Sequence, residues 1–356
     1  MKLSCLQKDL LKGLKTVSKA VATRSTLPIL SNVMLVAASD GLELVATDLE
    51  ISIKAIVTAD VDIEGSTTVP ANTLTDWVNS LSGETVKMEL LEMEKLKLSC
   101  GRQRANIKGV SAAEFPTISP AQEGFYLETE KLLRMVRRTI ISAARDESRP
   151  ILEGVYFSIE NNNLTLAAAD GFRLSVCTAH VPHQQVNTII IPARALKELA
   201  RVAEASDTML SVMENQVRFK SGNVSIISQL IDGNFPDYEQ IIPKDSVTVV
   251  EVDAEGFRRA CSTASIFARE SANIATVTVG EGSLTVAAKS AEHGDSTATI
   301  DAKVEGEPIA FAISVQYLLD YLNTVDDVVM EIMTPSSPIK FSSEYTHIIM
   351  PMMLSG

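Results

Sequence analysis

The chain repeats itself at long range, and this feature constrains its fold more than any other. Residues 29–33 (ILSNV) recur as residues 151–155 (ILEGV), and residues 69–71 (VPA) recur as residues 191–193 (IPA), both 122 positions later. Residues 115–116 and 235–236 are both Phe-Pro, at an offset of 120. Several matches in one order at nearly one offset predict an internal repeat of about 120 residues.

A period of that length is too long for a solenoid unit, so each repeat should be a domain with its own core. We expect domains at 1–119, 120–247 and 248–356, the third being the faintest copy. Within each, a first helix (6–21, 131–144, 256–268) and a second helix (72–81, 194–205, 314–322) alternate with strands marked by period-two hydrophobicity. This order predicts an α+β fold of three similar domains, each with two helices packed on antiparallel sheets.

Composition excludes some classes of protein. With 46% hydrophobic residues in 356, the chain is not disordered, and its net charge of −13 argues at first against a nucleic-acid binder. Cysteines 5, 100, 177 and 261 form no CxxC pair and are expected to be reduced core thiols. The N-terminus lacks the apolar run of a signal peptide and no stretch reaches about 18 apolar residues, so we expect a cytoplasmic protein.

The positive charge is segregated on helices. Lys8, Lys12, Lys15 and Lys19 fall within an arc of about 60° on the first helix, opposite its leucines. The same pattern recurs with Lys131, Arg134, Arg138 and Arg145, with Arg194, Lys197 and Arg201, and more weakly with Arg258, Arg259 and Arg269. Residues 7–24, 131–149, 194–204 and 255–270 together carry +10, which leaves −23 for the rest of the chain. One basic surface on an acidic body is the result.

A charged stripe opposite an apolar stripe is usually only a solvated helix face. Here acids are few on the first helices of repeats one and two, and the stripe recurs at equivalent positions, which favours a surface that meets a polyanion. Asn and Gln, which can contact base edges, are sparse on these helix faces, and no helix-turn-helix, zinc-finger or basic-zipper spacing is present. Phosphate contacts alone give sequence-independent, salt-sensitive binding, which suits movement along DNA.

Five segments in order, 24–30 (RSTLPIL), 47–50 (TDLE), 170–174 (DGFRL), 235–238 (FPDY) and 350–354 (MPMML), resemble the bacterial DNA polymerase III beta subunits, the sliding clamps. The resemblance covers essentially the whole chain. It implies a head-to-tail homodimeric ring of six domains, with helices around a central hole, that holds duplex DNA and makes the replicative polymerase processive. The candidate DNA-binding residues are Lys8, Lys12, Lys15, Lys19, Arg24, Arg134, Arg138, Arg149, Arg194 and Lys197, of which Arg194 and Lys197 come from helix phase alone.

The resemblance also implies a pocket for short linear motifs of the polymerase alpha subunit, the clamp loader, other DNA polymerases and repair proteins. Its members would be Leu152, Ala169, Gly171, Phe172, Arg173, Leu174, Pro236, Gln240, Ile241, Ser314, Tyr317, Pro338, Ile348, Ile349, Met350, Pro351, Met352, Met353 and Leu354. The Met-rich end is adaptable apolar surface, although Ile348 and Ile349 equally suit a buried last strand. Phe172, Ala169, Gln240 and Met353 depart from the family's usual residues and predict a less polar pocket with altered motif preference.

Ile266 and Phe267 look like the apolar part of a subunit interface, with the edge strand around Arg102, Ala105 and Ile107 as its partner. Ordinary helix core is the alternative for the two apolar residues.

No Walker-A, GxGxxG or GxSxG sequence occurs, and His180 and His183 alone are an incomplete metal site. We therefore expect no enzyme, cofactor or metal. Two alternatives to a clamp stay open: an interaction scaffold that binds peptides without encircling DNA, and an enzyme on the same frame, which a substrate-sized polar cleft would favour.

Overall fold

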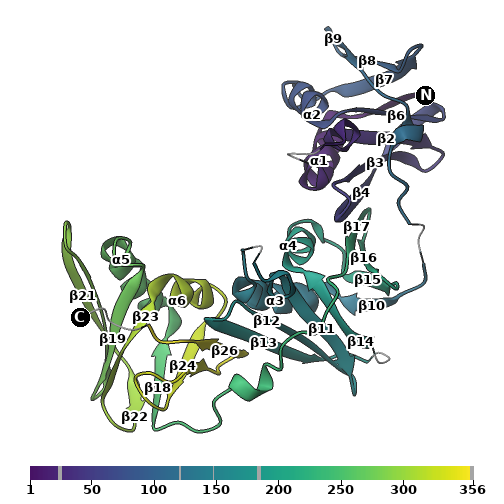
Figure 1. Ribbon diagram of the computed structural model, residues 1–356. Coiled ribbons are helices and arrows are strands. Elements are labelled where there is room, and N and C mark those ends of the chain that lie inside the picture. Colours follow the sequence, from purple (N-terminus) through teal and green to yellow (C-terminus); the bar gives the residue numbers. More distant parts are fainter. Residues whose placement is uncertain (23–25, 120–121, 147, 183–185, 353–356) are drawn as a thin grey trace. The chain divides into compact units, whose positions relative to one another are not determined.

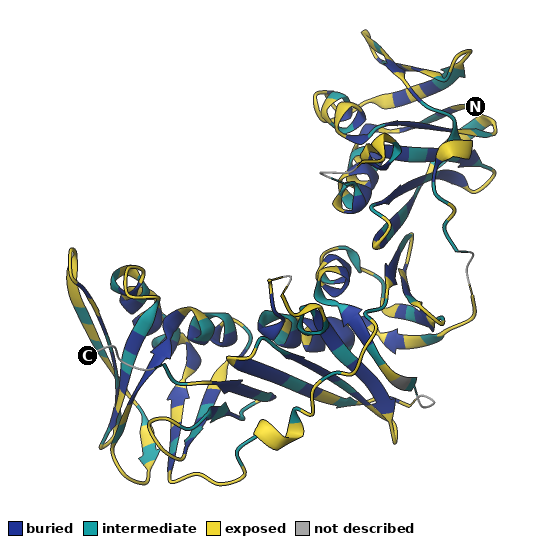
Figure 2. Cartoon of the chain, in the orientation of Figure 1, coloured by how far each residue is buried: buried dark blue, intermediate teal, exposed yellow. Residues whose placement is uncertain are grey.

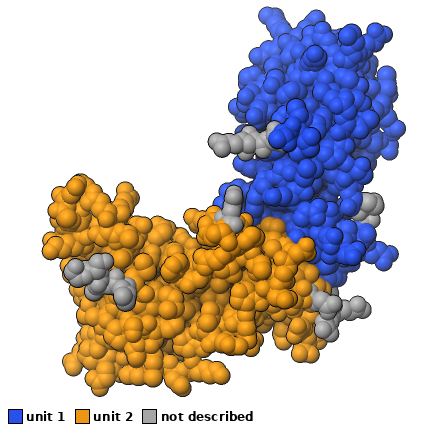
Figure 3. Space-filling model, viewed as in Figure 1, with its two compact units in different colours: residues 1–132, 194–230 blue, residues 133–193, 231–356 orange. Residues whose placement is uncertain are grey.

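The computed structural model describes residues 1–22, 26–119, 122–146, 148–182 and 186–352. The chain forms two compact units (Figure 3), one of residues 1–132 and 194–230 and the other of residues 133–193 and 231–356. The division passes through the middle repeat because each sheet of that repeat continues into a neighbouring repeat. Strands of repeats one and two share one sheet, and strands of repeats two and three share another.

The described residues of the first unit form two antiparallel sheets (Figure 1). The smaller has the order β5-β1-β7-β8-β9, with β5 Ala59–Ile63, β1 Lys2–Leu6, β7 Thr85–Leu91, β8 Lys95–Cys100 and β9 Gln103–Lys108. The larger has the order β10-β15-β16-β17-β4-β3-β2-β6, with β10 Phe125–Glu128, β15 Asp207–Val212, β16 Gln216–Ser221, β17 Val224–Gln229, β4 Ile51–Val57, β3 Gly41–Thr47, β2 Asn32–Ala38 and β6 Gly65–Pro70.

The second unit repeats this plan. Its nine-stranded sheet has the order β14-β11-β12-β13-β26-β25-β24-β18-β22, with β14 Val186–Pro192, β11 Gly154–Glu160, β12 Asn163–Ala169, β13 Arg173–His180, β26 Thr346–Ile349, β25 Ile339–Phe341, β24 Asp327–Ile332, β18 Thr248–Asp253 and β22 Lys303–Glu305. Its four-stranded sheet has the order β21-β20-β19-β23, with β21 Gly294–Asp301, β20 Ser283–Ser290, β19 Ile274–Gly280 and β23 Ile309–Ser314.

Within the described ranges six α-helices accompany the sheets, two for each repeat: α1 Gln7–Val17, α2 Ala71–Asn79, α3 Thr129–Thr139, α4 Ala193–Val202, α5 Ala254–Ala268 and α6 Val315–Leu322. Each lies within a few residues of the helix expected from periodicity, and the α+β class is confirmed.

Leu6 was expected on the apolar side of the first helix but is 47% exposed. It is the last residue of β1, so the helical period does not apply to it.

The core of each unit lies between its helices and sheets, where strand residues are buried and outer helix faces are exposed (Figure 2). Leu10, Leu14 and Val17 of α1 are fully buried. Gly13 lets α1 approach the sheet closely, since a Cβ there would lie 2.7 Å from Val57 Cγ2. All four cysteines are buried free thiols, as expected. No helix in the described part of the chain is long and apolar enough to span a membrane.

Candidate nucleic-acid and peptide interfaces

The first basic surface belongs to α1 and α4 of the first unit. Lys8, Lys12, Lys15 and Lys19 are all exposed, opposite the buried leucines of α1. On α4, Arg194, Lys197 and Arg201 are exposed, whereas Ala195, Leu196 and Leu199 are buried. A groove of about 480 Å³ lies between the two helices and is lined by Lys8, Lys12 and Lys15 of α1, by Lys19 of the short 3-10 helix that follows α1, and by Arg201. The amphipathic pattern therefore gathers cations from two repeats on one surface of this unit.

Some of these cations have partners. Lys12 Nζ lies 2.7 Å from Glu204 Oε2, with both side chains exposed. Arg194 Nη1 lies 2.6 Å from Asp48 Oδ2, and its Nη2 donates to the Lys19 carbonyl at 3.1 Å. Arg201 Nη1 lies 2.7 Å from Glu198 Oε1. Arg201 was part of the charged stripe in the sequence but not among the expected DNA-binding residues, and the groove adds it to them.

The second basic surface is on α3 and the segment that follows it. Arg134 and Arg149 are exposed, and Arg149 Nη2 donates to the Asp170 carbonyl at 2.9 Å. Arg138 is different, because its side chain is only 13% exposed, forms an ion pair with Glu344 and lies over the Tyr345 ring at 5.5 Å. Its charge is thus compensated within the unit, and the exposed neighbour Arg137 takes its place on the surface. Arg24 lies outside the described residues.

The expected peptide site lies where β13 of repeat two meets β26 of repeat three. Arg173 pairs with Ile349 and Leu174 with Ile348, and Met350 N donates to the Phe172 carbonyl at 2.8 Å. Ile348 and Ile349 are 2% and 0% exposed, so for them the alternative of a buried last strand is the structure observed. The chain then leaves the sheet and Met352 bridges to Ala312. Met353 and Leu354 lie outside the described residues.

The other expected pocket residues differ in exposure. Phe172, Ile241 and Met350 are 51%, 51% and 36% exposed, an unusual amount of apolar surface for such side chains. Gly171, Pro236 and Gln240 are also exposed; Leu152, Ala169, Tyr317, Pro338, Pro351 and Met352 are half-buried; Arg173, Leu174 and Ser314 are buried. The buried members support the site through packing and caps, as Ser314 does by accepting from Tyr317 N at the start of α6.

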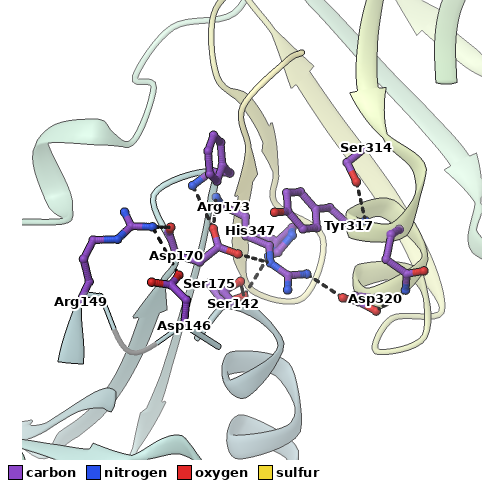
Figure 4. Close-up of polar contacts among 12 residues, drawn as sticks. Ser142, Asp146, Arg149, Asp170, Arg173, Ser175, Ser314, Tyr317, Asp320 and His347 are labelled. Carbon is purple, nitrogen blue, oxygen red and sulfur yellow. Dashed lines mark hydrogen bonds and ion pairs between the residues drawn. The ribbon is translucent and has the colours of Figure 1, made fainter. Parts of the chain in front are cut away.

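A buried arginine organises this region (Figure 4). Arg173, 6% exposed, lies 2.9 Å from Asp170 Oδ2 through Nε and 2.7 Å from Asp320 Oδ2 through Nη1, and its guanidinium lies 4.2 Å from the centre of the Tyr317 ring. Asp170 is in repeat two and Asp320 is in repeat three. Arg173 therefore joins the two repeats by charge-assisted hydrogen bonds in a place where water is largely excluded.

A second polar chain crosses the same junction. Ser142 Oγ and Ser175 Oγ are 2.8 Å apart, and Ser175 Oγ is 2.8 Å from His347 Nδ1. His347 is fully buried and stacks on Tyr321, and its Nε2 has no hydrogen-bond partner in the part of the chain that the structure describes. Burial, together with the nearby Arg173 charge, lowers the pKa of His347 to about 3. His347 is not among the functional residues expected from the sequence, where no pattern distinguishes it.

In the described part of the chain, β9 of repeat one and β21 of repeat three are each the last strand at one edge of their sheet. Arg102 is exposed in the turn before β9 and Ala105 is half-buried, but Ile107 is only 6% exposed because it faces the core of its own domain. Ile266 is 58% exposed on α5 and Phe267 is half-buried. The helix-core alternative therefore fails for Ile266.

Potential metal ligands gather once in the described part of the chain. Glu270, Glu292 and His293 have ligand atoms within 4.8 Å of one another, but all three are exposed and His293 Nε2 already lies 3.0 Å from Glu270 Oε1. His180 is exposed in β13, and His183 lies outside the described residues. We assign no metal to either place.

Comparison with known proteins gives matches along the whole chain. Models of the DNA polymerase III beta subunit match residues 1–119 (N-terminal domain), 126–237 (central domain) and 239–353 (C-terminal domain). The beta sliding clamp of Pseudomonas putida is 31% identical over 358 aligned residues, covering 97% of this chain and 98% of that protein. The Bacillus subtilis beta sliding clamp is 31% identical over 90% of both chains. The crystal structure of the DNA polymerase sliding clamp from Bacillus subtilis superposes with a TM-score of 0.92 at 27% identity, covering 99% of both chains.

Proposed function

The chain belongs to the DNA polymerase III beta subunit family, and on this premise we propose that it is a sliding clamp that encircles duplex DNA as a homodimeric ring and makes the replicative polymerase processive. The family is one of non-catalytic processivity factors, and we infer that this chain catalyses no reaction. We place it in the cytoplasm.

The continuity of the sheets between repeats carries this proposal. Repeat one joins repeat two through β4 and β17, and repeat two joins repeat three through β13 and β26, both antiparallel. By the same rule β21 of repeat three should pair with the strand equivalent to β17 and β26, which is β9 of repeat one. Each chain has one β9 edge and one β21 edge. In a dimer, β21 of each copy would therefore pair with β9 of the other copy, and these two head-to-tail contacts close a ring.

Charge on the two edges supports that pairing. Arg102, Arg104 and Lys108 are exposed on or beside β9, whereas Asp295 and Asp301 are exposed on β21. Opposite charges on facing strands favour the correct register and disfavour pairing of two like edges. The exposed Ile266 on α5 would add apolar area to this contact.

The basic surfaces supply the path of the DNA. The α1 and α4 cations belong to repeats one and two, and Arg134, Arg137 and Arg149 continue the series in repeat two. We propose that these residues face the phosphates of the enclosed duplex. Retention then depends on the closed ring, while the contacts stay sequence-independent and weak.

The apolar surface at the β13–β26 junction supplies the attachment of partners. Phe172, Ile241 and Met350 would receive the aromatic and leucine side chains of short motifs. We propose the polymerase alpha subunit, the clamp loader, other DNA polymerases and repair proteins as the owners of such motifs.

Retention on DNA of different topology tests the function. We expect the protein, loaded by a clamp loader, to be retained on nicked circular DNA and lost when one cut makes the DNA linear.

Ile266→Asp should weaken dimerisation by about tenfold or more, since a buried isoleucine contributes about 1.5–3 kcal/mol. Sedimentation equilibrium would measure the dimer dissociation constant.

A peptide scaffold that never encircles DNA predicts a different result. For a scaffold, Lys15→Glu with Arg134→Glu would leave clamp-dependent synthesis intact. For a clamp, the double variant loses synthesis but still binds a polymerase peptide in a fluorescence anisotropy titration. Equal retention on circular and linear DNA would refute the clamp.

A further inference from the structure

The groove between α1 and α4 has an unexpected acidic residue in its wall. Glu198 of α4 lines the groove together with four lysines and Arg201, yet it is only 6% exposed. Its Oε1 accepts from Arg201 Nη1 at 2.7 Å, whereas its Oε2 is buried and has no hydrogen-bond partner among the described residues. A carboxylate oxygen in this state forgoes hydrogen bonds that water would otherwise give it, and so requires an explanation.

The cations that line the groove are the possible hydrogen-bond donors to that oxygen. Lys8, Lys15 and Lys19 have no carboxylate within ion-pair distance in the described part of the chain, and their ammonium groups end long, rotatable stems. Arg201 is held by Glu198 but remains half-exposed to the groove. The groove thus offers mobile cations and one acceptor that is not fully used.

We propose that Glu198 is a competing acceptor for the cations of this groove, and that it keeps the hold on a passing DNA phosphate weak. The proposal rests on the clamp function above. Phosphate groups of one strand occupy the groove in turn and are bound by Arg201 and the α1 lysines. When a phosphate leaves, Arg201 is left with Glu198 Oε1, the pair seen in this structure, and the negative charge of the carboxylate offsets the charge of the groove lysines.

The physical effect is on the energy profile along the DNA. A groove of cations alone binds most strongly whenever a phosphate is centred in it, which creates a barrier at every nucleotide step. An internal carboxylate stabilises the lysines between steps and lowers the net attraction at each step, because charges a few ångströms apart interact strongly in a partly desolvated groove. Glu198 is therefore a positioning residue for Arg201 and a regulator of sliding, without contacting the DNA itself.

The test replaces the carboxylate by its amide. Glu198→Gln keeps the size and the hydrogen bond to Arg201 but removes the charge. We expect the affinity for a fluorescent 30-base-pair duplex, measured by anisotropy at low salt, to rise about fivefold. We expect the one-dimensional diffusion constant of the loaded ring, followed by single-molecule fluorescence, to fall by a similar factor.

Glu204→Gln is the matched control, because it makes the same change in net charge next to the same surface. Glu204 is exposed and paired with Lys12, so solvent and salt screen its effect. We expect less than about a twofold change in either measurement. Should Glu198→Gln fail to fold, Glu198→Asp keeps the charge but shortens the reach, and it should bind and slide within about twofold of the parent protein.

The outcomes separate this inference from the clamp function. Wild-type affinity and diffusion in Glu198→Gln would overturn the inference, and so would changes equal to those of Glu204→Gln. If the parent protein is not retained on circular DNA, the clamp function fails, but the duplex-binding comparison still decides whether Glu198 competes with phosphates.

Discussion

The two junctions between repeats share one backbone design and differ in their side chains. In both, an antiparallel strand pair continues the sheet, β4 with β17 in the first unit and β13 with β26 in the second. In both, an aspartate at the turn before the strand, Asp48 or Asp170, accepts hydrogen bonds from two backbone N–H groups of its own turn. The turn and the strand pairing therefore suffice to join two repeats.

The ion pairs at the two junctions lie in different surroundings. At the first, Asp48 binds Arg194, whose side chain is 47% exposed. At the second, Asp170 binds Arg173, whose side chain is 4% exposed and also binds Asp320 across the junction. Exposed pairs contribute little to stability, whereas breaking a buried pair leaves an uncompensated charge. The second junction, next to the expected peptide surface, is thus the more strictly specified of the two.

The largest effect should come from removing the buried arginine. Arg173→Ala leaves two carboxylates facing each other with little access to water, and we expect the unit that contains it to lose about 3 kcal/mol or more of unfolding free energy. Arg194→Ala at the equivalent contact should cost less than about 1 kcal/mol. Urea denaturation of both variants, monitored by far-UV circular dichroism, measures the difference in unfolding free energy. Equal losses would show that the buried and the exposed ion pair contribute equally to stability.

An intermediate effect should appear in the pH dependence. The pKa of His347 is lowered to about 3 in the folded protein by burial and by Arg173, whereas the unfolded chain has the ordinary value near 6.5. Between these values the unfolded state binds more protons, so stability is complete above pH 6.5 and falls as the pH is lowered, by at most about 1.4 kcal/mol per pH unit.

His347→Gln, which can still hydrogen-bond Ser175, should flatten this dependence between pH 6.5 and 4.5. His180→Gln, at an exposed position, should leave it unchanged. Unfolding midpoints measured at each pH decide the matter, and a parallel dependence in His347→Gln and the parent protein would assign the acid sensitivity to other groups.

These contrasts also mark how far the sequence could be interpreted. The repeat and the hydrophobic periods predicted the six helices and the fold class, because both depend on local patterns that survive in each copy. Arg138 shows where such patterns fail: helical phase placed it with Arg134 on the surface, but Glu344 and Tyr345, two hundred residues away, cover it. Ile107 fails for a similar reason, since alternation along β9 does not tell which face meets the core.

The burial of charge was equally inaccessible. Asp170 and Arg173 were noted as part of a motif, but their partner Asp320 has no counterpart in any recognisable pattern. The same holds for the chain from Ser142 to His347 and for Glu198, which the sequence presents as an ordinary helix acid. Long-range partners are fixed by the packing of whole repeats, and a single sequence records them only as isolated polar residues.

The smallest effect concerns the turn that the junctions share. Gly171 has φ +93°, a conformation that favours glycine, and a Cβ there would lie 2.6 Å from Arg149 Nη1. The equivalent residue at the first junction is Leu49, with φ 80° and 50% exposure, so repeat one tolerates a side chain where repeat two has none. Leu49→Gly relieves backbone strain but raises the conformational entropy of the unfolded chain, and we expect the two effects to cancel to within about 1 kcal/mol.

Gly171→Leu introduces the strain and displaces Arg149 from the Asp170 carbonyl, so it should cost about 1–3 kcal/mol of unfolding free energy. Thermal unfolding of the two variants measures the asymmetry. Equal costs would mean that the turns of the two junctions are interchangeable, and that only their buried charges distinguish them.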